Sequence, residues 1–307
     1  MSELTFDGRV AVITGAGRGL GRAYALLLAE RGARVVVNDN GGALTGAGVD
    51  DGPAAEVTAE IVAAGGQAVA STDSVATAAG GAAMIQTAVE NFGSADILIH
   101  NAGNVRRAAL ADMSDEDFDA VLDVHLRGAF HVVRAALPHM RKASYGRIVL
   151  TSSIGGLYGN HDVANYAAAK AGVIGLANVV ALEGAADNVR CNVIVPAAVT
   201  RMAEGIDTSA YPAMGPELVA PVVGWLAHET CTVTGEVFTA IAGRIARIAT
   251  VESRGVYAPQ WTLEDVAAQM DVIRDVSDPV HFPAVPDGHA DHIRYSFAMA
   301  AREVGHG

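Results

Sequence analysis

The feature that most constrains this chain is an alternation of short, β-branched apolar runs with longer segments whose apolar residues recur at helical spacing. The first run, Val10–Thr14, ends in a glycine, and the helix-like segment Arg18–Arg31 follows it. This alternation predicts a parallel sheet, because parallel strands need a long crossover between them. Read along the chain, it predicts seven strands: Val10–Thr14, Arg34–Asn38, Ala68–Thr72, Ile97–Asn101, Arg147–Ser152, Arg190–Val195 and Val237–Ile241.

The segments between these runs are expected to be helices. Since crossovers between parallel strands are almost always right-handed, the helices should cover both faces of the sheet. We therefore predict an α/β protein with a doubly wound Rossmann fold, in which a seven-stranded parallel sheet is flanked by helices and binds ligands at the carboxyl ends of its strands. Beyond the first helix, the expected helical stretches are 53–64, 76–92, 114–141, 158–183 and 217–228.

Two segments depart from the alternation. Asn40–Pro53 is rich in Gly and Asp and is expected to be a long surface loop. The sheet pattern ends at Ile241, although Thr262–Arg274 and Asp291–Arg302 still have helical periodicity. No repeat or low-complexity tract separates the tail from the rest, so we predict a single domain over residues 1–307, with 242–307 as its helical C-terminal extension.

Composition excludes several classes of function. The chain has 21 Lys and Arg against 34 Asp and Glu, a net charge of −13, which disfavours binding to nucleic acid or to an anionic membrane. With 51% hydrophobic and 18% charged residues, the chain has the composition of an ordered globular protein. No run approaches the ~18 apolar residues of a membrane span.

The expected location is the cytoplasm. Cys191 and Cys231 form no CxxC pair and are expected to be idle thiols in a reducing compartment. The first ten residues include Glu3 and Asp7 and lack the basic and apolar regions of a secretory signal. A metal site is not expected. The one candidate cluster, His289-Ala290-Asp291-His292, lies in the tail without a visible further ligand and is interpreted as surface residues.

The first chemical signal is the sequence TGAGRGLG at residues 14–21, between a predicted strand and a predicted helix. Gly15, Gly19 and Gly21 allow a tight turn, a close approach of the backbone to a pyrophosphate and close packing of the helix on the strand. A glycine pattern alone is weak, but this one has the strand and helix that the motif requires, which favours dinucleotide binding over a structural turn.

Asp39, at the end of the second predicted strand, bears on the choice of dinucleotide. A carboxylate there accepts hydrogen bonds from the ribose hydroxyls and repels a 2′-phosphate, so NAD is favoured over NADP. Two other interpretations stay open: Asp39 caps its own turn, or Arg18 binds the extra phosphate of NADP.

The second signal is the pair Tyr166 and Lys170, whose spacing of four places both side chains on one face of a helix. A nearby ammonium would lower the pKa of the tyrosine from about 10 and make it a usable acid–base group. Tyrosine and lysine at this spacing also occur by chance. Ser153, thirteen residues before Tyr166 and next to a predicted strand end, strengthens the case because its hydroxyl can polarise a carbonyl.

Taken together, these residues resemble the short-chain dehydrogenase/reductase family. The resemblance extends over about the first 240 residues and includes TGAGRGLG at 14–21, Asn101-Ala102-Gly103, Ser153, Tyr166 and Lys170, in the family's order. It implies that Ser153, Tyr166 and Lys170 are catalytic, with Asp73 near the adenine. It also implies cofactor contacts from Gly15, Arg18, Gly19, Leu20, Gly21, Asp39, Asp73, Ser74, Asn101, Ala102, Gly103, Tyr166, Lys170, Pro196 and Val199.

The chain departs from the family's pattern in two places. His125 stands where the family usually has the asparagine of its proton relay, and it either serves in that relay, as a fourth catalytic residue, or only packs in its helix. The family's Pro-Gly after the sixth strand is replaced by Pro196-Ala197, whose backbone can still contact the nicotinamide if its dihedral angles allow.

A narrower resemblance is to the (3R)-hydroxyacyl-CoA dehydrogenase units of peroxisomal multifunctional enzymes type 2, also called 17β-hydroxysteroid dehydrogenases type 4. It is carried by VHLRG at 124–128, YGRI at 145–148, YGN at 158–160, ANY at 164–166, GLAN at 175–178 and NDNGG at 38–42. The chain ends without a hydratase or sterol-carrier region, so a stand-alone dehydrogenase is expected.

The implied activity is NAD-dependent interconversion of a secondary alcohol and a ketone, with a (3R)-3-hydroxyacyl-CoA as the expected substrate. Two alternatives stay open: a hydroxysteroid dehydrogenase, and a non-catalytic protein that senses NAD. Six arginines are candidates for binding the phosphates of a CoA thioester: Arg106, Arg107, Arg201, Arg244, Arg247 and Arg254.

The expected assembly is a homodimer, or a tetramer, formed through the helices around 114–141 and 158–183. This expectation follows from the resemblance, and the Ala, Gly and Val residues of the second helix suit close helix packing.

Overall fold

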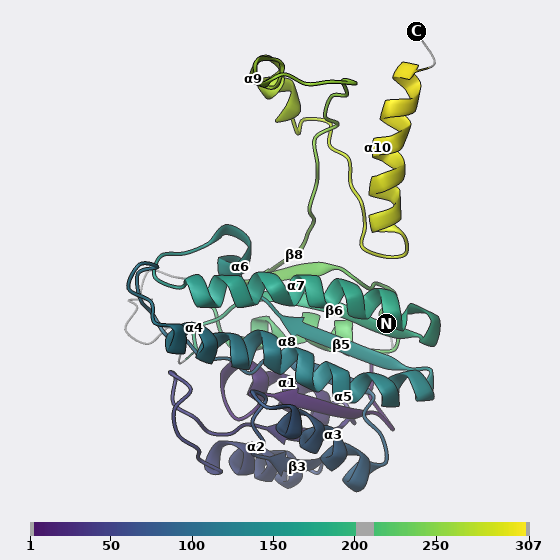
Figure 1. Cartoon of the computed structure of the whole chain (residues 1–307). Helices are drawn as coiled ribbons and strands as arrows, with labels where there is room; N and C mark the ends of the chain where they lie inside the picture. The colour runs from purple at the N-terminus through teal and green to yellow at the C-terminus, as the bar shows by residue number, and fades with distance from the viewer. Residues whose placement is uncertain (1–2, 201–211, 305–307) are drawn as a thin grey trace. The chain divides into compact units, whose positions relative to one another are not determined.

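The structure, a computed structural model, describes residues 3–200 and 212–304. Its centre is an eight-stranded sheet in the order β3-β2-β1-β4-β5-β6-β7-β8 (Figure 1). The strands are β1 (Val10–Thr14), β2 (Arg34–Asn38), β3 (Gln67–Ser71), β4 (Ile97–His100), β5 (Gly146–Thr151), β6 (Val189–Ala197), β7 (Val237–Ile241) and β8 (Arg244–Ile248).

The first seven strands are parallel, and the predicted doubly wound Rossmann fold is confirmed. Strand order runs outward in both directions from the β1–β4 pair, with β2 and β3 on one side and β5 to β7 on the other. The loops that leave β1 and β4 therefore diverge to opposite faces of the sheet. This divergence opens a crevice at the carboxyl ends of the two strands, where folds of this class bind their ligands.

The predicted strand count of seven omits β8. Only Ala242 and Gly243 connect β7 to β8, and both have positive φ, 49° and 80°. Two such residues make a hairpin, so β8 runs antiparallel to the other strands. Asn-Gly or Asp-Gly is the usual sequence signal for this turn, and alanine rarely adopts positive φ, so no local pattern marks the hairpin.

The helices cover both faces of the sheet, as right-handed crossovers require. On one face α1 packs between α2 and α8, and on the other α5 packs between α3 and α7. The helices are α1 (Gly19–Glu30), α2 (Gly52–Ala63), α3 (Ala78–Phe92), α4 (Asp115–Leu122), α5 (Gly128–Ala143), α6 (Ile154–Tyr158), α7 (Ala164–Gly184), α8 (Ala220–Ala227), α9 (Leu263–Ile273) and α10 (Gly288–Val304).

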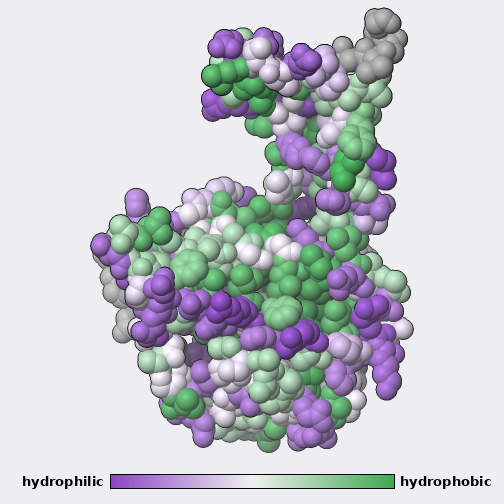
Figure 2. Space-filling view, viewed as in Figure 1, coloured by the Kyte–Doolittle hydropathy of each residue, from purple (hydrophilic) through white to green (hydrophobic). Residues whose placement is uncertain are grey.

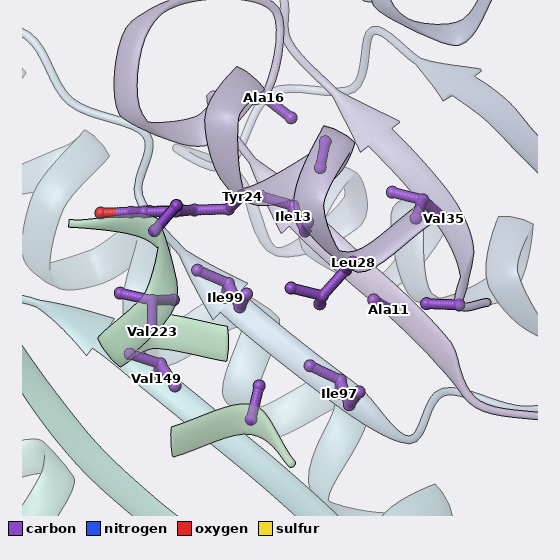
Figure 3. Packing of buried hydrophobic residues seen from close by; sticks show 14 of the residues in the cluster. Ala11, Ile13, Ala16, Tyr24, Leu28, Val35, Ile97, Ile99, Val149 and Val223 are labelled. Atoms are coloured by element: carbon purple, nitrogen blue, oxygen red, sulfur yellow. The ribbon is translucent and has the colours of Figure 1, made fainter. Parts of the chain in front are cut away.

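The core beneath α1 and α8 is made of aliphatic side chains and one tyrosine (Figure 3). Tyr24 and Leu28 of α1 pack against Val223 of α8 and the central strands, and all three are fully buried. Each such side chain contributes roughly 1.5–3 kcal/mol when it is removed from water. This packing fixes the beginning of α1 relative to β1, where the glycine motif lies.

Two predicted helices are interrupted. The stretch predicted as a helix over 114–141 contains a π-helix, η1 (Asp123–Arg127), between α4 and α5. The helix predicted over 158–183 begins later than expected: Tyr158 is the last residue of the short α6, residues 159–163 are not helical, and α7 begins at Ala164. Gly159 and Asp162 have positive φ, 74° and 63°, which ends one helix before the next begins. Tyr166 therefore lies in the first turn of α7, not in the middle of a helix.

By its internal contacts the chain divides into two compact units, Met1–Arg247 and Ile248–Gly307. The second contains α9 and α10. Thr262 and Asp265 form a capping box at the beginning of α9, and Phe282 packs edge-on against His292 and Tyr295. The boundary lies six residues after the one expected at 242. That the extension belongs to the same domain stays a prediction.

One helical stretch, residues 164–187, is long and apolar enough to cross a membrane by length and composition alone. It contains α7, which packs on β5 and β6 and buries eight of its residues, Lys170 among them. This is the arrangement of a core helix, which passes the same test.

Arg147 is the largest side chain that the fold buries, at the edge opposite to the crevice. Its guanidinium donates to the carbonyl oxygens of Gly146, Asn188, His228 and Glu229 at 2.8–3.2 Å. Among the residues that the structure describes, it pairs with no carboxylate. It joins the beginnings of β5 and β6 to the end of α8. We expect Arg147→Leu to lower the free energy of unfolding by about 3 kcal/mol, since several buried carbonyls would lose their donors.

Chemical denaturation measures this change. Arg147→Lys, which keeps the charge but fewer donors, should lose less. Arg141→Ala breaks an exposed ion pair with Asp187 and should cost at most about 1 kcal/mol. Equal stabilities of the Arg147→Leu variant and the wild type would contradict this role.

Candidate active site

A cleft of about 540 Å³ lies at the carboxyl ends of β1, β2, β4, β5 and β6, as the strand order predicts. It brings together most of the residues that the sequence predicted for the site. These are Gly15, Arg18, Gly19, Leu20, Asp39, Asp73, Ser74, Asn101, Ala102, Gly103, His125, Tyr166, Lys170 and Pro196. Three predicted residues, Gly21, Ser153 and Val199, do not line it.

The glycine turn between β1 and α1 packs closely against the loop that follows β4. Gly15 and Gly19 have positive φ, 64° and 53°, and a Cβ on Gly15 would lie 2.8 Å from the Cα of Ala102. A Cβ on Gly21 would overlap the carbonyl oxygen of Gly15, so Gly21 acts by packing α1 onto the turn and not by lining the cleft. Arg18, the N-cap of α1, makes no side-chain cap, which leaves the helix N-terminus to the cleft.

A hydrogen-bond network joins the ends of β1 and β4. The Thr14 hydroxyl oxygen accepts from the backbone N–H groups of Asn101 and Ala102, each at 3.1 Å. Its own proton is then left for Nδ1 of His100, 3.0 Å away, and this places the ring proton of His100 on Nε2, which donates to the carbonyl of His125. Burial lowers the pKa of His100 to about 3, so this ring is neutral.

The side chain of Asn101 also ties the two loops together. Its amide nitrogen donates to the carbonyl oxygen of Gly15 at 3.1 Å, across the crevice from β4 to the glycine turn.

Asp39 lies beside the glycine turn. Its Oδ2 accepts from the backbone N–H of Gly17 at 3.0 Å, and its Oδ1 accepts from the N–H of Gly41 at 2.8 Å. The carboxylate lines the cleft and keeps lone pairs for further donors. Asp39 thus both caps its own turn and lines the cleft. Arg18 lies near Asp50, at 4.0 Å.

Tyr166 and Lys170 meet Ser153 on the other side of the cleft. The Lys170 ammonium donates to the carbonyl oxygen of Thr151 at 2.6 Å and lies 5.6 Å from the centre of the Tyr166 ring. Ser153 is the N-cap of α6, where its hydroxyl accepts from the N–H of Gly155 at 3.1 Å. The Ser153 hydroxyl and the Tyr166 ring also lie near each other, because a Cβ on Gly155 would be 3.6 Å from the hydroxyl oxygen and 3.8 Å from the ring.

The predicted electrostatics of this pair need a correction. Burial raises the pKa of Tyr166 above its ordinary value, and the groups that oppose this rise are the Ser153 hydroxyl and the Arg107 guanidinium. Lys170 is not among them. Burial lowers the pKa of Lys170 itself to about 7. The spacing placed the two side chains on one face but did not reveal that both would be buried.

His125 is buried in the π-helix η1, with 1% of its surface exposed. Its Nε2 contacts the backbone N and O of Asn104 at 3.1 and 2.8 Å, and its ring packs edge-on against Tyr166 with centroids 5.1 Å apart. A Cβ on Gly103 would lie 2.5 Å from this ring, so the ring requires glycine there. Burial, reinforced by Lys170, lowers the pKa of His125 well below its ordinary value.

Several residues of the site were missed from the sequence. Thr14 ends the predicted first strand, and His100 is the last residue of β4, one residue before the predicted end of that strand. Polar residues at the ends of apolar runs were the available signal. The loop after β2 was expected only to cover the surface, yet Gly42, Ala43, Leu44 and Gly46 line the cleft. No short motif marked Asn104 or Thr151, which also line it, and Arg106 was expected only as a candidate for binding CoA.

The cleft suits a dinucleotide. Three buried side-chain atoms without a hydrogen-bond partner belong to residues that line it: Oδ1 of Asn104, Nδ1 of His125 and Oγ1 of Thr151. They are polar groups that a ligand can satisfy. The glycine turn and the N-terminus of α1, which has no side-chain cap, add backbone N–H donors for phosphate groups.

The six arginines proposed for CoA do not form one group. Arg106 pairs with Asp117, Arg247 with Glu236 and Arg254 with Asp278. Arg201 lies outside the described residues. Arg107 and Arg244 have no ion pair within residues 3–200 and 212–304. In the same ranges no three His, Cys, Asp or Glu side chains are grouped to hold a metal ion. His292 of the tail cluster pairs with Glu252 at 3.0 Å.

Val199 lies beside the cleft but not in it. Its side chain is 41% exposed, and its N–H donates to the carbonyl of Met214 at 2.7 Å. Its neighbours Pro196, Ala197 and Ala198 do line the cleft, which places the altered Pro-Ala segment at the predicted end of β6.

Comparisons with known proteins agree with this site. The family described as short chain dehydrogenase matches residues 9–209. A peroxisomal multifunctional enzyme type 2 of Drosophila melanogaster is 48% identical over 291 residues, 93% of this chain and 48% of the relative. A short-chain type dehydrogenase/reductase of Mycobacterium tuberculosis is 47% identical over 271 residues, 88% of this chain and 95% of the relative.

The structure of the full-length Drosophila enzyme has a TM-score of 0.79 and 42% identity, over 95% of this chain and 50% of that one. The chain thus spans about half the length of this multifunctional relative. The match to the family covers strands β1 to β6, the glycine turn and the polar residues grouped around Tyr166. The chain belongs to the short-chain dehydrogenase family, whose enzymes bind a nicotinamide dinucleotide.

Proposed function

We propose that this enzyme is an NAD-dependent oxidoreductase that interconverts a (3R)-3-hydroxyacyl-CoA and its 3-oxo form. The observation that carries the proposal is that one cleft joins the glycine turn and Asp39 to Tyr166 and Lys170, with the Ser153 hydroxyl near the tyrosine ring. A protein that only senses NAD would need the glycine turn and Asp39 but not Tyr166, Lys170 and Ser153.

The two halves of the cleft have separate tasks. The glycine turn, Asp39 and Lys170 would hold the dinucleotide, whose nicotinamide supplies the hydride chemistry when bound. In oxidation the Tyr166 phenolate takes the proton of the substrate hydroxyl, and the Ser153 hydroxyl donates to the developing carbonyl oxygen. In reduction the Tyr166 phenol returns that proton. Lys170, anchored on Thr151, keeps two N–H donors for a ribose.

The choice of NAD rests on charge. The Asp39 carboxylate lines the cleft beside the glycine turn, and it would repel a 2′-phosphate. Arg18, the cation that could offset this repulsion, lies near Asp50. A ribose with free hydroxyls suits this arrangement.

The substrate class rests on similarity. The sequence motifs resemble (3R)-hydroxyacyl-CoA dehydrogenase units, and the Drosophila relative carries the name of a peroxisomal multifunctional enzyme type 2. Arg107 gives the side of the cleft near Tyr166 a positive charge, which suits an anionic substrate. A hydroxysteroid would not use this charge.

We also propose a homodimer through α5 and α7. On the face shown in Figure 2, hydrophobic side chains gather over these helices. Phe130 of α5 and Val179 and Leu182 of α7 are 43–50% exposed. Paired helices of two copies would cover them.

The reaction is tested with purified protein and a panel of 3-hydroxyacyl-CoA esters and hydroxysteroids, with NAD and with NADP. We expect NADH formation from the (3R)-3-hydroxyacyl-CoA esters. Tyr166→Phe should lower kcat by at least about 10²-fold, because the proton acceptor is lost, while the affinity for NADH stays within about twofold. A wild-type protein that binds NADH and oxidises none of the panel would favour the sensor, and equal activity of the Tyr166→Phe variant would refute the role of the tyrosine.

The glycine turn is tested with Gly21→Ala. The added methyl group overlaps the Gly15 carbonyl, so the turn must open, and we expect NADH affinity to fall at least about tenfold. Fluorescence titration of NADH measures it. Gly175→Ala is the matched control, because a Cβ there has no heavy atom within 4 Å and α7 should tolerate it. An unchanged affinity in Gly21→Ala would show that the turn does not hold the dinucleotide.

The pH dependence follows from the raised pKa of Tyr166. Oxidation needs the phenolate, whose fraction grows about tenfold per pH unit below the pKa, so kcat/KM for oxidation should still rise at pH 9. Because the Ser153 hydroxyl lowers this pKa, Ser153→Ala should move the rise to higher pH. Initial rates between pH 6 and 10 test this. Ser114→Ala, which removes the cap of α4, should leave the profile in place.

A further inference from the structure

The loop after β2, residues 40–50, folds over the cleft as a closed unit. The N–H of Asp50 donates to the carbonyl of Asn40 at 2.9 Å and joins the two ends of the loop. At its tip the N–H of Ala43 donates to the carbonyl of Ala47 at 2.7 Å. Ala43, Leu44 and Gly46 of this tip line the cleft. The loop is therefore a preformed strap on the same side of the cleft as Asp39.

The tip reaches the opposite wall, which is the loop after β4. The backbone N–H of Val105 donates to the carbonyl of Leu44 at 3.0 Å, and the Arg106 guanidinium donates through Nε to the carbonyl of Thr45 at 3.1 Å. Gly46 packs against Asn104, where a Cβ would lie 2.7 Å from the side-chain amide. These contacts bring together segments about sixty residues apart in the sequence.

Arg106 is itself fixed in place. Its Nη1 lies 3.1 Å from Asp117 and 3.4 Å from Glu116 on α4, and its side chain is only 23% exposed. Its carbonyl oxygen accepts from the side chain of Asn165 at 3.1 Å, next to Tyr166. A planar guanidinium with five donors can serve α4 and the strap together, which a single ammonium at that position cannot.

We propose that Arg106 is a positioning residue that holds the strap of residues 40–50 across the cleft and so retains the bound dinucleotide. This rests on the proposed function, because it requires that the cleft bind NAD. The strap closes over the side of the cleft that carries Asp39, and Arg106 is the side chain that ties it to α4. Arg106 then acts on the dissociation of the cofactor, not on the chemistry at Tyr166.

The test compares Arg106→Met and Arg106→Lys with the wild type by NADH binding and by hydrogen exchange. Without the guanidinium, we expect NADH to bind roughly tenfold more weakly, mainly because it dissociates faster. This is about the effect of losing one hydrogen bond from a charged donor that is partly exposed to solvent. Backbone amides of residues 40–50 should exchange faster in the protein without NADH. Arg106→Lys should recover part of both effects.

The matched control is Arg127→Met. Arg127 also pairs with carboxylates of the α4 segment, Asp119 and Asp123, but does not line the cleft or contact the strap. It should change neither NADH affinity nor exchange in residues 40–50. If Arg127→Met weakens NADH as much as Arg106→Met, or if exchange in the strap is the same in Arg106→Met and the wild type, the proposal is overturned.

Failure of the proposed function has a different signature. A wild-type protein that binds neither NADH nor NADPH would refute cofactor binding by the cleft, and with it the retention role of Arg106. Normal NADH affinity in Arg106→Met, beside a wild type that oxidises 3-hydroxyacyl-CoA, would refute the retention role alone.

Discussion

The tie between the ends of β1 and β4 is the constraint on which the rest of the site depends. At this one point the chain leaves adjacent strands in opposite directions, and the Thr14 hydroxyl and the Asn101 amide hold the two departing loops together. The glycine turn can approach Ala102 only because Gly15 lacks a side chain. Any substituent that separates these loops would disturb both the dinucleotide half and the catalytic half of the cleft.

Much of the framework could be predicted from the sequence because its signals are local. Val10–Thr14 and Arg34–Asn38 are strands with the predicted bounds, since buried parallel strands are continuous apolar runs. The glycine turn and Asp39 fall where a strand, a turn and a helix put them. Ser153, Tyr166 and Lys170 were located by spacing and order, and the structure places the three side chains near one another. Their catalytic roles stay a prediction.

What could not be predicted depends on tertiary environment. The pKa of Tyr166 and that of Lys170 are moved in opposite directions by burial, which a spacing of four residues cannot express. The break between α6 and α7 depends on a positive φ at Asp162, a residue type that only sometimes adopts it. The sequence of the strap, residues 40–50, has the pattern of an ordinary polar loop. Its contacts could not be predicted from that pattern, because its partners Val105 and Arg106 lie far along the chain.

The π-helix at residues 123–127 limits how the length of the chain between α4 and α5 can change. A π-turn contains one residue more than an α-turn, so α5 is rotated about its axis relative to an uninterrupted continuation of α4. The rotation lets α4 face α7 and the wall of the cleft while α5 faces α3 and the sheet. Removal of a single residue here would restore ordinary winding, swing His125 away from the tyrosine ring and turn the buried stripe of α5 out of register. The segment is therefore sensitive to any change in its length.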